Sequence, residues 1–128
     1  MWTFTWKREV TAYYLHSGGH ANTCHGDGTR SITPPERETP DRFLYDPLQP
    51  VPTKGGAIRC RRIFTSGAFE QRDIEERQDV LVYSSPILEE NMEVTGPVKV
   101  RPWAASSTPD TDFVVRLIDV HPDARHTI

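Results

Sequence analysis

The 128-residue sequence predicts an all-β fold, a sandwich of short strands, and two observations support this class. Segments rich in β-branched and aromatic residues recur at short spacing, most clearly in the second half of the chain. Eleven prolines and eight glycines gather between these segments and leave little room for long helices. Because the chain is short and 36 % of its residues are hydrophobic, we expect one domain over residues 1–128 with a modest core.

The first half of the chain is expected to hold two strands and a long loop. Residues 10–16 are rich in β-branched and aromatic side chains and end before Gly18 and Gly19. A turn at Asp27 and Gly28 precedes a short return strand over residues 29–33. The Pro-rich segment from about 34–56 lacks backbone donors that a sheet would need, so we expect an extended surface loop there.

The second half carries the strongest strand signal. Residues 70–79 come first and are polar, with Ile74 as their one apolar side chain, which predicts a loop with room for a single helical turn. In residues 98–103, valine and proline alternate with lysine, arginine and tryptophan, the period of two expected for a sheet with one buried face. The predicted strands of this half are residues 80–83, 92–95, 98–104 and 113–120.

Charge and hydropathy exclude several kinds of partner. The net charge of −3 offers no basic excess for phosphates or anionic lipid head groups, so neither nucleic acid nor a membrane is an expected partner. Residues 1–9 lack the apolar core of a signal peptide, and no segment reaches the roughly 20 apolar residues of a membrane span. We therefore expect a cytoplasmic protein in which Cys24 and Cys60 form no disulfide.

Possible metal ligands gather in one short segment, and they are His16, His20, Cys24 and His25. Gly18 and Gly19 indicate that the chain turns between the first two histidines, whereas a helix would be needed to align them. No zinc-site spacing of the usual kinds is present, and we predict no metal and no cofactor. Asp110 and Asp112, even with Asp27, are too few for calcium, and we expect them to accept backbone N–H bonds at turns.

Signals for catalysis are missing from the sequence. No Gly-x-Ser-x-Gly elbow is present, so Ser17 and Ser66 stand in simple Ser-Gly turn pairs, and no phosphate-binding glycine loop occurs. We assign no catalytic and no cofactor-binding residue. Three tryptophans, Trp2, Trp6 and Trp103, could form a stacking platform of a carbohydrate-binding module, although aromatic residues of a small β domain are expected in its core.

A series of short segments, in matching order and spacing along nearly the whole chain, resembles one known protein family. They are Tyr14–Asn22, Gly26–Thr29, Tyr45–Pro47, Pro50–Thr53, Gly55–Gly56, Gln71–Arg72, Asp79–Ser84, Glu93–Val98, Ser106–Ser107, Asp110–Phe113 and Leu117–Asp123. They resemble the C-terminal non-catalytic domain of the cocaine-esterase and X-Pro dipeptidyl-peptidase family of serine hydrolases. The resemblance implies a jelly-roll β-sandwich, similar to galactose-binding domains, that packs on an α/β-hydrolase domain.

The same resemblance bears on function. The family's catalytic serine, aspartate and histidine lie upstream of the matched region, so none is carried over to this chain. The family's sandwich continues past residues 119–123, and Ala124 stands where the family favours glycine, so we expect an incomplete sandwich. The implied role is an accessory one in assembly or partner contacts, through self-association or an α/β-hydrolase partner. The alternative is one part of a split serine hydrolase whose catalytic domain is a separate chain.

Overall fold

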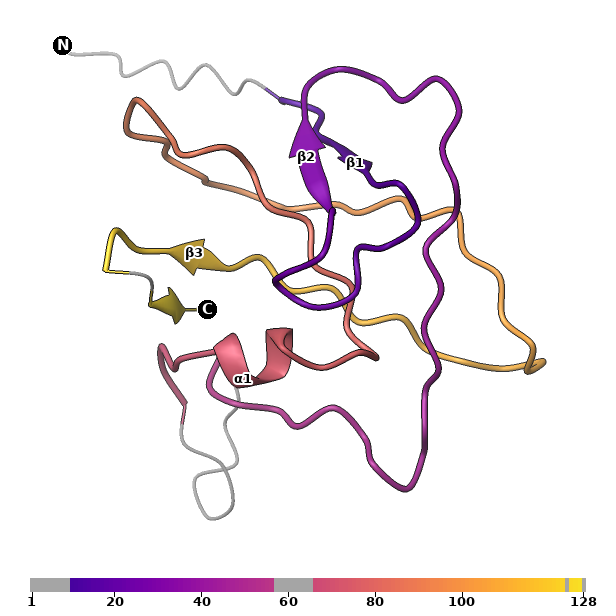
Figure 1. Ribbon diagram of the computed structural model, residues 1–128. Helices are drawn as coiled ribbons and strands as arrows, with labels where there is room; N and C mark the ends of the chain where they lie inside the picture. The colour runs from indigo at the N-terminus through magenta and orange to yellow at the C-terminus, as the bar shows by residue number, and fades with distance from the viewer. Residues whose placement is uncertain (1–9, 57–65, 124, 128) are drawn as a thin grey trace, which may run out of the picture. The chain divides into compact units, whose positions relative to one another are not determined.

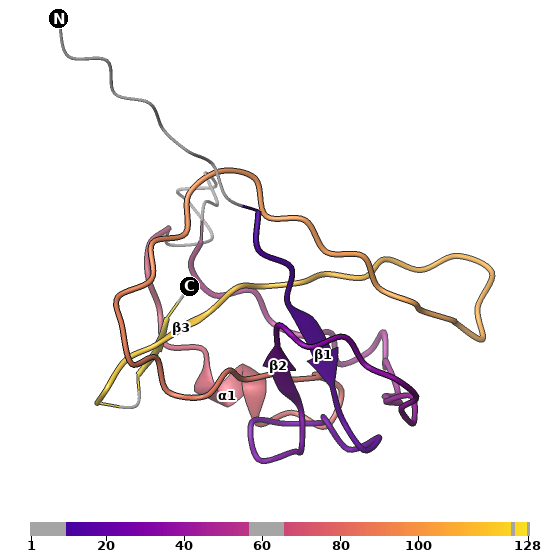
Figure 2. The same ribbon diagram turned by 90° about the horizontal axis from the view of Figure 1, so that it is seen from above.

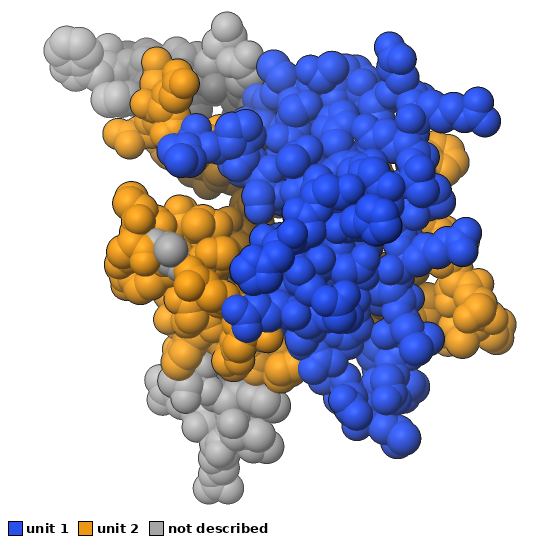
Figure 3. Space-filling model, viewed as in Figure 1, with its two compact units in different colours: residues 1–51, 74–87 blue, residues 52–73, 88–128 orange. Residues whose placement is uncertain are grey.

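The computed structural model describes residues 10–56, 66–123 and 125–127, and the chain divides into two compact units (Figure 3). Unit 1 comprises Met1–Val51 and Ile74–Ile87, and unit 2 comprises Pro52–Asp73 and Leu88–Ile128. Each unit is therefore built from two stretches of chain that are separated in the sequence. None of the helices among the described residues has the length and apolar character needed to cross a membrane.

Unit 1 contains a two-stranded antiparallel sheet. Strand β1, Tyr14–His16, pairs with β2, Thr29–Ser31, and the two strands lie side by side in both views (Figures 1 and 2). Both strands lie within the ranges predicted from sequence. The Arg30 N–H donates to the Ser84 carbonyl at 2.9 Å, and the Val82 N–H donates to the Ala21 carbonyl at 2.8 Å. These bonds attach the chain around residue 83 to the first 31 residues.

The turn between β1 and β2 depends on a close backbone approach. The Asp27 N–H donates to the His20 carbonyl at 3.0 Å, and the Asp27 carboxylate accepts from the N–H groups of Gly18 and His20. At Gly28 the backbone lies so close to residue 82 that a Cβ atom would stand 2.0 Å from the Val82 carbonyl oxygen. Only glycine leaves room for this contact.

The one helix of the described chain, α1, covers Arg72–Glu75 and makes a single turn. This agrees with the prediction for residues 70–79. Within unit 1, Ile74 is one of the few buried apolar side chains, with 4 % of its surface exposed, and Ala21 is the other among the described residues. The Cys24 N–H donates to the Glu75 carbonyl at 2.7 Å, which connects the end of the helix to the turn after β1.

Unit 2 is organised around the buried side chain of Gln71, which has no exposed surface. Its Nε2 group donates to the carbonyls of Lys54 and Phe69 at 3.2 and 2.9 Å, and its Oε1 accepts from Arg116 Nη1 at 2.9 Å. The Gln71 N–H donates to the His126 carbonyl at 2.8 Å. Three separate segments of unit 2 are therefore joined by hydrogen bonds to one amide side chain.

A second short antiparallel pair lies in unit 2. Strand β3, Asp119–Val120, pairs with β4, His126–Thr127, with Asp119 opposite Thr127. The N–H of His126 also donates to Glu70 Oε1 at 3.1 Å. The sequence predicts β3 as the end of a strand over residues 113–120 but predicts no strand at the position of β4, so this pair was missed.

Several predicted strands are absent from the described residues. No strand covers 80–83, 92–95 or 98–104, and of residues 113–120 only the last two form one. Leu81 and Ser84 make isolated bridges to Asn22 and Thr29 instead. The predictions for these segments are wrong because an alternating pattern describes a preference, whereas a strand needs a neighbour to accept and donate its backbone hydrogen bonds. The fold is mostly irregular chain with small antiparallel strands.

The close approach at Gly28 gives a test of the fold. We expect Gly28→Ala to lower the free energy of unfolding by at least about 2 kcal/mol, because its Cβ would meet a backbone carbonyl that cannot move aside. Urea denaturation followed by circular dichroism measures the loss.

Gly96→Ala is the matched control, since Gly96 has a φ of 95° but no neighbour within 4 Å of a Cβ atom. A loss of about 1 kcal/mol is expected there. Equal losses for the two variants would contradict the proposed clash.

Candidate functional site

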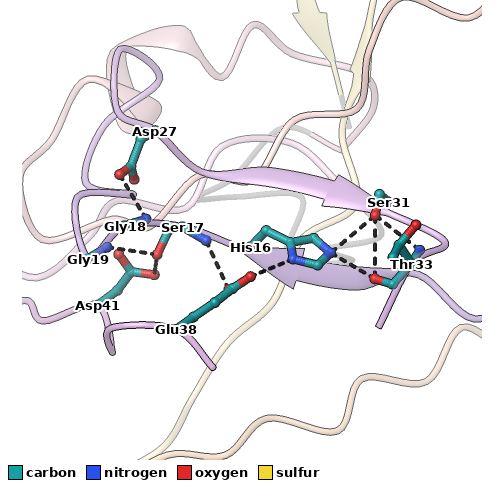
Figure 4. A network of polar contacts seen from close by, with 9 residues as sticks. All are labelled: His16, Ser17, Gly18, Gly19, Asp27, Ser31, Thr33, Glu38 and Asp41. Carbon is teal, nitrogen blue, oxygen red and sulfur yellow. Dashed lines mark hydrogen bonds and ion pairs between the residues drawn. The ribbon is translucent and has the colours of Figure 1, made fainter. Parts of the chain in front are cut away.

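The densest polar cluster of unit 1 is centred on Asp41, within the Pro-rich loop. Its Oδ2 accepts from the hydroxyls of Ser17 and Tyr83, each at 2.6 Å, and its Oδ1 accepts from the Ala21 N–H at 2.8 Å. Figure 4 shows the Ser17 contact beside the bonds that hold Gly18 and Gly19. One carboxylate thus joins the turn after β1, the Pro-rich loop and the chain at residue 83.

These contacts change the acid–base properties of the cluster. Burial alone raises the pKa of the Asp41 carboxyl, but the hydrogen bonds from Ser17, Tyr83 and Ala21 outweigh burial and leave its pKa below the ordinary 3.8. Burial raises the pKa of Tyr83, and its hydrogen bond to the Asp41 carboxylate raises that pKa further. Asp41 is therefore ionised and Tyr83 keeps its proton at neutral pH, which is the charge state that this donor–acceptor arrangement requires.

His16 at the end of β1 forms a second polar cluster (Figure 4). Its Nδ1 lies 2.6 Å from Glu38 Oε1, and its Nε2 lies 2.9 Å from the Thr33 carbonyl oxygen and 3.1 Å from Ser31 Oγ. The other oxygen of Glu38 accepts from the Ser17 N–H at 3.2 Å. The cluster connects β1 and β2 to the beginning of the Pro-rich loop.

The order Ser31, His16, Glu38 resembles the hydroxyl, imidazole and carboxylate of a serine hydrolase, but the geometry at Nε2 differs from what catalysis needs. A general base must present an unprotonated nitrogen to the serine hydroxyl. The Thr33 carbonyl can only accept a hydrogen bond, so its contact requires the proton on His16 Nε2. Ser31 Oγ in turn accepts from the Thr33 N–H at 3.1 Å. The three side chains therefore form a structural connection between strands and loop.

The other candidate metal ligands do not converge. Among the described residues no group of three or more histidine, cysteine, aspartate or glutamate side chains is placed to hold a metal ion. His20 contributes its backbone to the Asp27 turn, and Cys24 contributes its N–H to Glu75. The prediction that Cys24 and Cys60 form no disulfide remains a prediction, since Cys60 lies outside the described residues.

Asp27, which the sequence places at a turn, accepts backbone N–H bonds from Gly18 and His20. Asp110 and Asp112 differ from the prediction: no hydrogen bond within the described chain involves either side chain. At Asp110 only the backbone carbonyl takes part, as it accepts from Thr108 Oγ1 at 3.2 Å. Both carboxylates are exposed.

The tryptophan analysis has a mixed outcome. Trp103 is fully exposed, so the prediction that it lies in the core is wrong. Trp2 and Trp6 lie outside the described residues, so the alternative of a stacking platform formed by all three is not tested. Ser66 is exposed beside Gly67, whose N–H and carbonyl form a bridge with Gly56.

A surface hollow of about 390 Å³ in unit 1 is lined by residues none of which the sequence indicated as a catalytic or metal-binding candidate. Arg77 donates to both oxygens of Asp79, at 2.7 and 2.6 Å, and to the Gln49 carbonyl at 2.8 Å. The hydrogen bond from Arg77 holds the pKa of Asp79 below its ordinary value. Among the described residues Arg77 is thus paired with Asp79, and this ion pair forms one side of the hollow. The lining residues are Leu44, Asp46, Gln49, Arg77, Gln78 and Asp79.

The sequence analysis missed Asp41 and Tyr83 as site residues. They are 42 positions apart, and no short motif relates a carboxylate after a proline to a tyrosine at the end of an apolar segment. The turn glycines and Ser17 were singled out, but the acceptor that holds them could be found only from the structure. Together the clusters use the reactive side chains of unit 1 for internal connections.

Comparison with known proteins gives the particular family. Residues 3–128 match the X-Pro dipeptidyl-peptidase C-terminal non-catalytic domain, and the chain belongs to this family. It is 44 % identical over 123 residues to a cocaine esterase from Rhodococcus sp. (strain MB1 Bresler). That match covers 94 % of this chain and 21 % of the esterase, so the chain spans about one fifth of the relative's length. No solved structure gives a significant match.

The Asp41 cluster predicts a pH-dependent stability. We expect Asp41→Asn to lower the free energy of unfolding by about 2 kcal/mol at pH 7, since three hydrogen bonds to a charged acceptor are weakened. Because the pKa of Asp41 is lower in the folded chain, its stabilisation is present above the ordinary 3.8 and is lost as the pH falls through the folded value. The difference between wild type and variant should shrink in acid, as measured by urea denaturation at several pH values.

Two further variants make this test specific. Tyr83→Phe removes one donor, so it should move the acid loss of stability to higher pH. Asp46→Asn is the control, because among the described residues that carboxylate accepts only the Leu48 N–H, at 2.9 Å within its own turn. A deficit of Asp41→Asn that stays the same at every pH would show that its charge plays no part.

Proposed function

We propose that this chain is an accessory assembly domain: it provides a surface for a separate α/β-hydrolase catalytic domain or another partner and performs no hydrolysis itself. The observation that carries the proposal is a long exposed segment of unit 2 rich in apolar side chains. Over residues 88–120 these are Leu88, Met92, Val94, Val98, Val100, Trp103, Phe113, Val114, Val115, Leu117 and Val120. Apolar surface of this extent is typical of surfaces that bind another protein.

The backbone of the same segment supports a role in association. Residues 93–118 form neither a strand nor a backbone–backbone hydrogen bond with the rest of the described chain. Extended chain with unpaired N–H and C=O groups can add to the sheet of a partner. We infer that a partner completes a jelly-roll sandwich of the kind that the family resemblance implies. The cytoplasmic location predicted from the sequence stays a prediction.

The polar clusters of unit 1 support the non-catalytic part of the proposal. Ser17 donates to Asp41, and the Ser31 hydroxyl meets a histidine nitrogen that the Thr33 carbonyl also engages. Neither serine has the free base that acyl transfer requires. The matched relative is named an esterase, and we attribute its hydrolysis to the four fifths of its length that this chain does not match.

Binding to a catalytic domain tests the proposal. The partner is the Rhodococcus cocaine esterase with its matching segment deleted, and binding is measured by isothermal titration calorimetry. We expect a complex in which the double variant Val98→Asp/Val100→Asp weakens binding at least about tenfold, because it places charge on exposed apolar positions of unit 2. Leu48→Asp is the control, since Leu48 is exposed to 91 % but belongs to unit 1.

The remaining outcomes distinguish the alternatives. Ester hydrolysis that occurs only in the mixture would favour the split serine hydrolase. Hydrolysis by this chain alone, or the absence of any complex, would overturn the proposal. Equal binding by the Val98/Val100 variant and the wild type would show that another surface is used.

A further inference from the structure

We propose that residues 111–117 pair with the same residues of a second copy of the chain, as two antiparallel strands related by a two-fold axis at Val114. This rests on the proposed assembly role and names one partner for one part of the exposed segment. The chain here is apolar and accessible: Val114 is 82 % exposed, and Phe113, Val115 and Leu117 are about half exposed. Unpaired strand-like chain of this kind is open to edge-to-edge association.

The order of side chains makes this segment complementary to itself. In an antiparallel pair centred on Val114, Asp112 of one copy stands opposite Arg116 of the other, and the symmetry produces this charge pair twice. Phe113 stands opposite Val115, an aromatic and β-branched pair that is favourable across strands. Opposite charges and apolar residues therefore meet in one register, with neither like charges nor proline in the seven paired positions.

The neighbouring predicted strand does not have this property. When residues 98–102 are paired with themselves in the same way about Val100, Lys99 stands opposite Arg101 and the like charges repel. Pro102 also lacks the N–H group that a central strand position must donate. The sequence thus favours residues 111–117 over 98–102 as the self-pairing segment, and it leaves the latter for a different partner.

Hydrogen bonds within unit 2 hold the Arg116 side chain in position for this contact. Its Nη1 donates to the buried Gln71 Oε1 at 2.9 Å, and its Nη2 faces the Pro52 carbonyl at 3.4 Å. A guanidinium has five N–H donors, so donors remain for a carboxylate of the second copy. Asp112 is exposed, and no hydrogen bond within the described chain engages its carboxylate. The acceptor is therefore available, and Gln71 fixes the position of the donor.

Sedimentation equilibrium of the full chain over a wide concentration range tests this dimer. We expect a reversible dimer, and Asp112→Arg should raise its dissociation constant by at least about tenfold, because two attractive pairs become two repulsive ones. Val114→Asp should have a similar effect, since it brings two carboxylates together at the axis. Glu89→Arg is the matched control, because it makes the same charge change at an exposed position of unit 2 outside the paired segment.

Circular dichroism of each variant shows whether it is folded, and both changed residues are exposed in the single chain. A chain that stays monomeric at all concentrations overturns the inference, as does a dimer whose affinity Asp112→Arg leaves unchanged. Calorimetry of the Asp112→Arg variant with the deleted esterase separates the two proposals. Retained binding by a monomeric variant supports two different surfaces, whereas loss of both would overturn the assignment of this segment to the second copy alone.

Discussion

The Asp41 carboxylate is the constraint on which the rest of unit 1 depends. Three donors from two distant parts of the chain meet it, namely the Ser17 and Tyr83 hydroxyls and the Ala21 N–H. With only Ala21 and Ile74 as buried apolar side chains among the described residues, hydrophobic burial supplies little of the ordering of unit 1. An ionised acceptor is well suited to this role, because hydrogen bonds to a charged group are roughly twice as strong as neutral ones.

In unit 2 a neutral side chain, Gln71, has the corresponding role. Gln71 is fully buried and offers both donors and an acceptor, so it can satisfy two carbonyls and a guanidinium at once. In both units, polar side chains take the position that a cluster of leucine or valine would occupy in a larger core. Many of the exposed apolar side chains lie in residues 88–120. For this reason we expect them to stabilise a complex with a partner more than the single chain.

Local features could be predicted from the sequence. Features that depend on a neighbouring segment from elsewhere in the chain could not. Strands β1 and β2 and the single turn of α1 follow from residue types, glycine turns and the isolated Ile74. Residues 98–104 have an equally regular pattern, yet they form no strand, because no described segment lies in position to share their hydrogen bonds. The Asp41 site could not be predicted for a related reason: its members are joined only by the fold. Histidines and serines that a motif search favours proved to be internal connections.

The division of unit 1 into two stretches has a consequence for how the chain acquires its structure. The Tyr83 hydroxyl reaches Asp41 across 42 positions, and residues 52–73 between the two stretches belong to the other unit. Forming a contact between residues so far apart in sequence costs the entropy of closing a long loop before the contact stabilises the fold. This cost slows folding. During synthesis, β1 and β2 leave the ribosome long before residue 83. Until then their sheet lacks the hydrogen bonds to the chain around residue 83. Unit 1 can therefore be completed only after residues 74–87 have been translated.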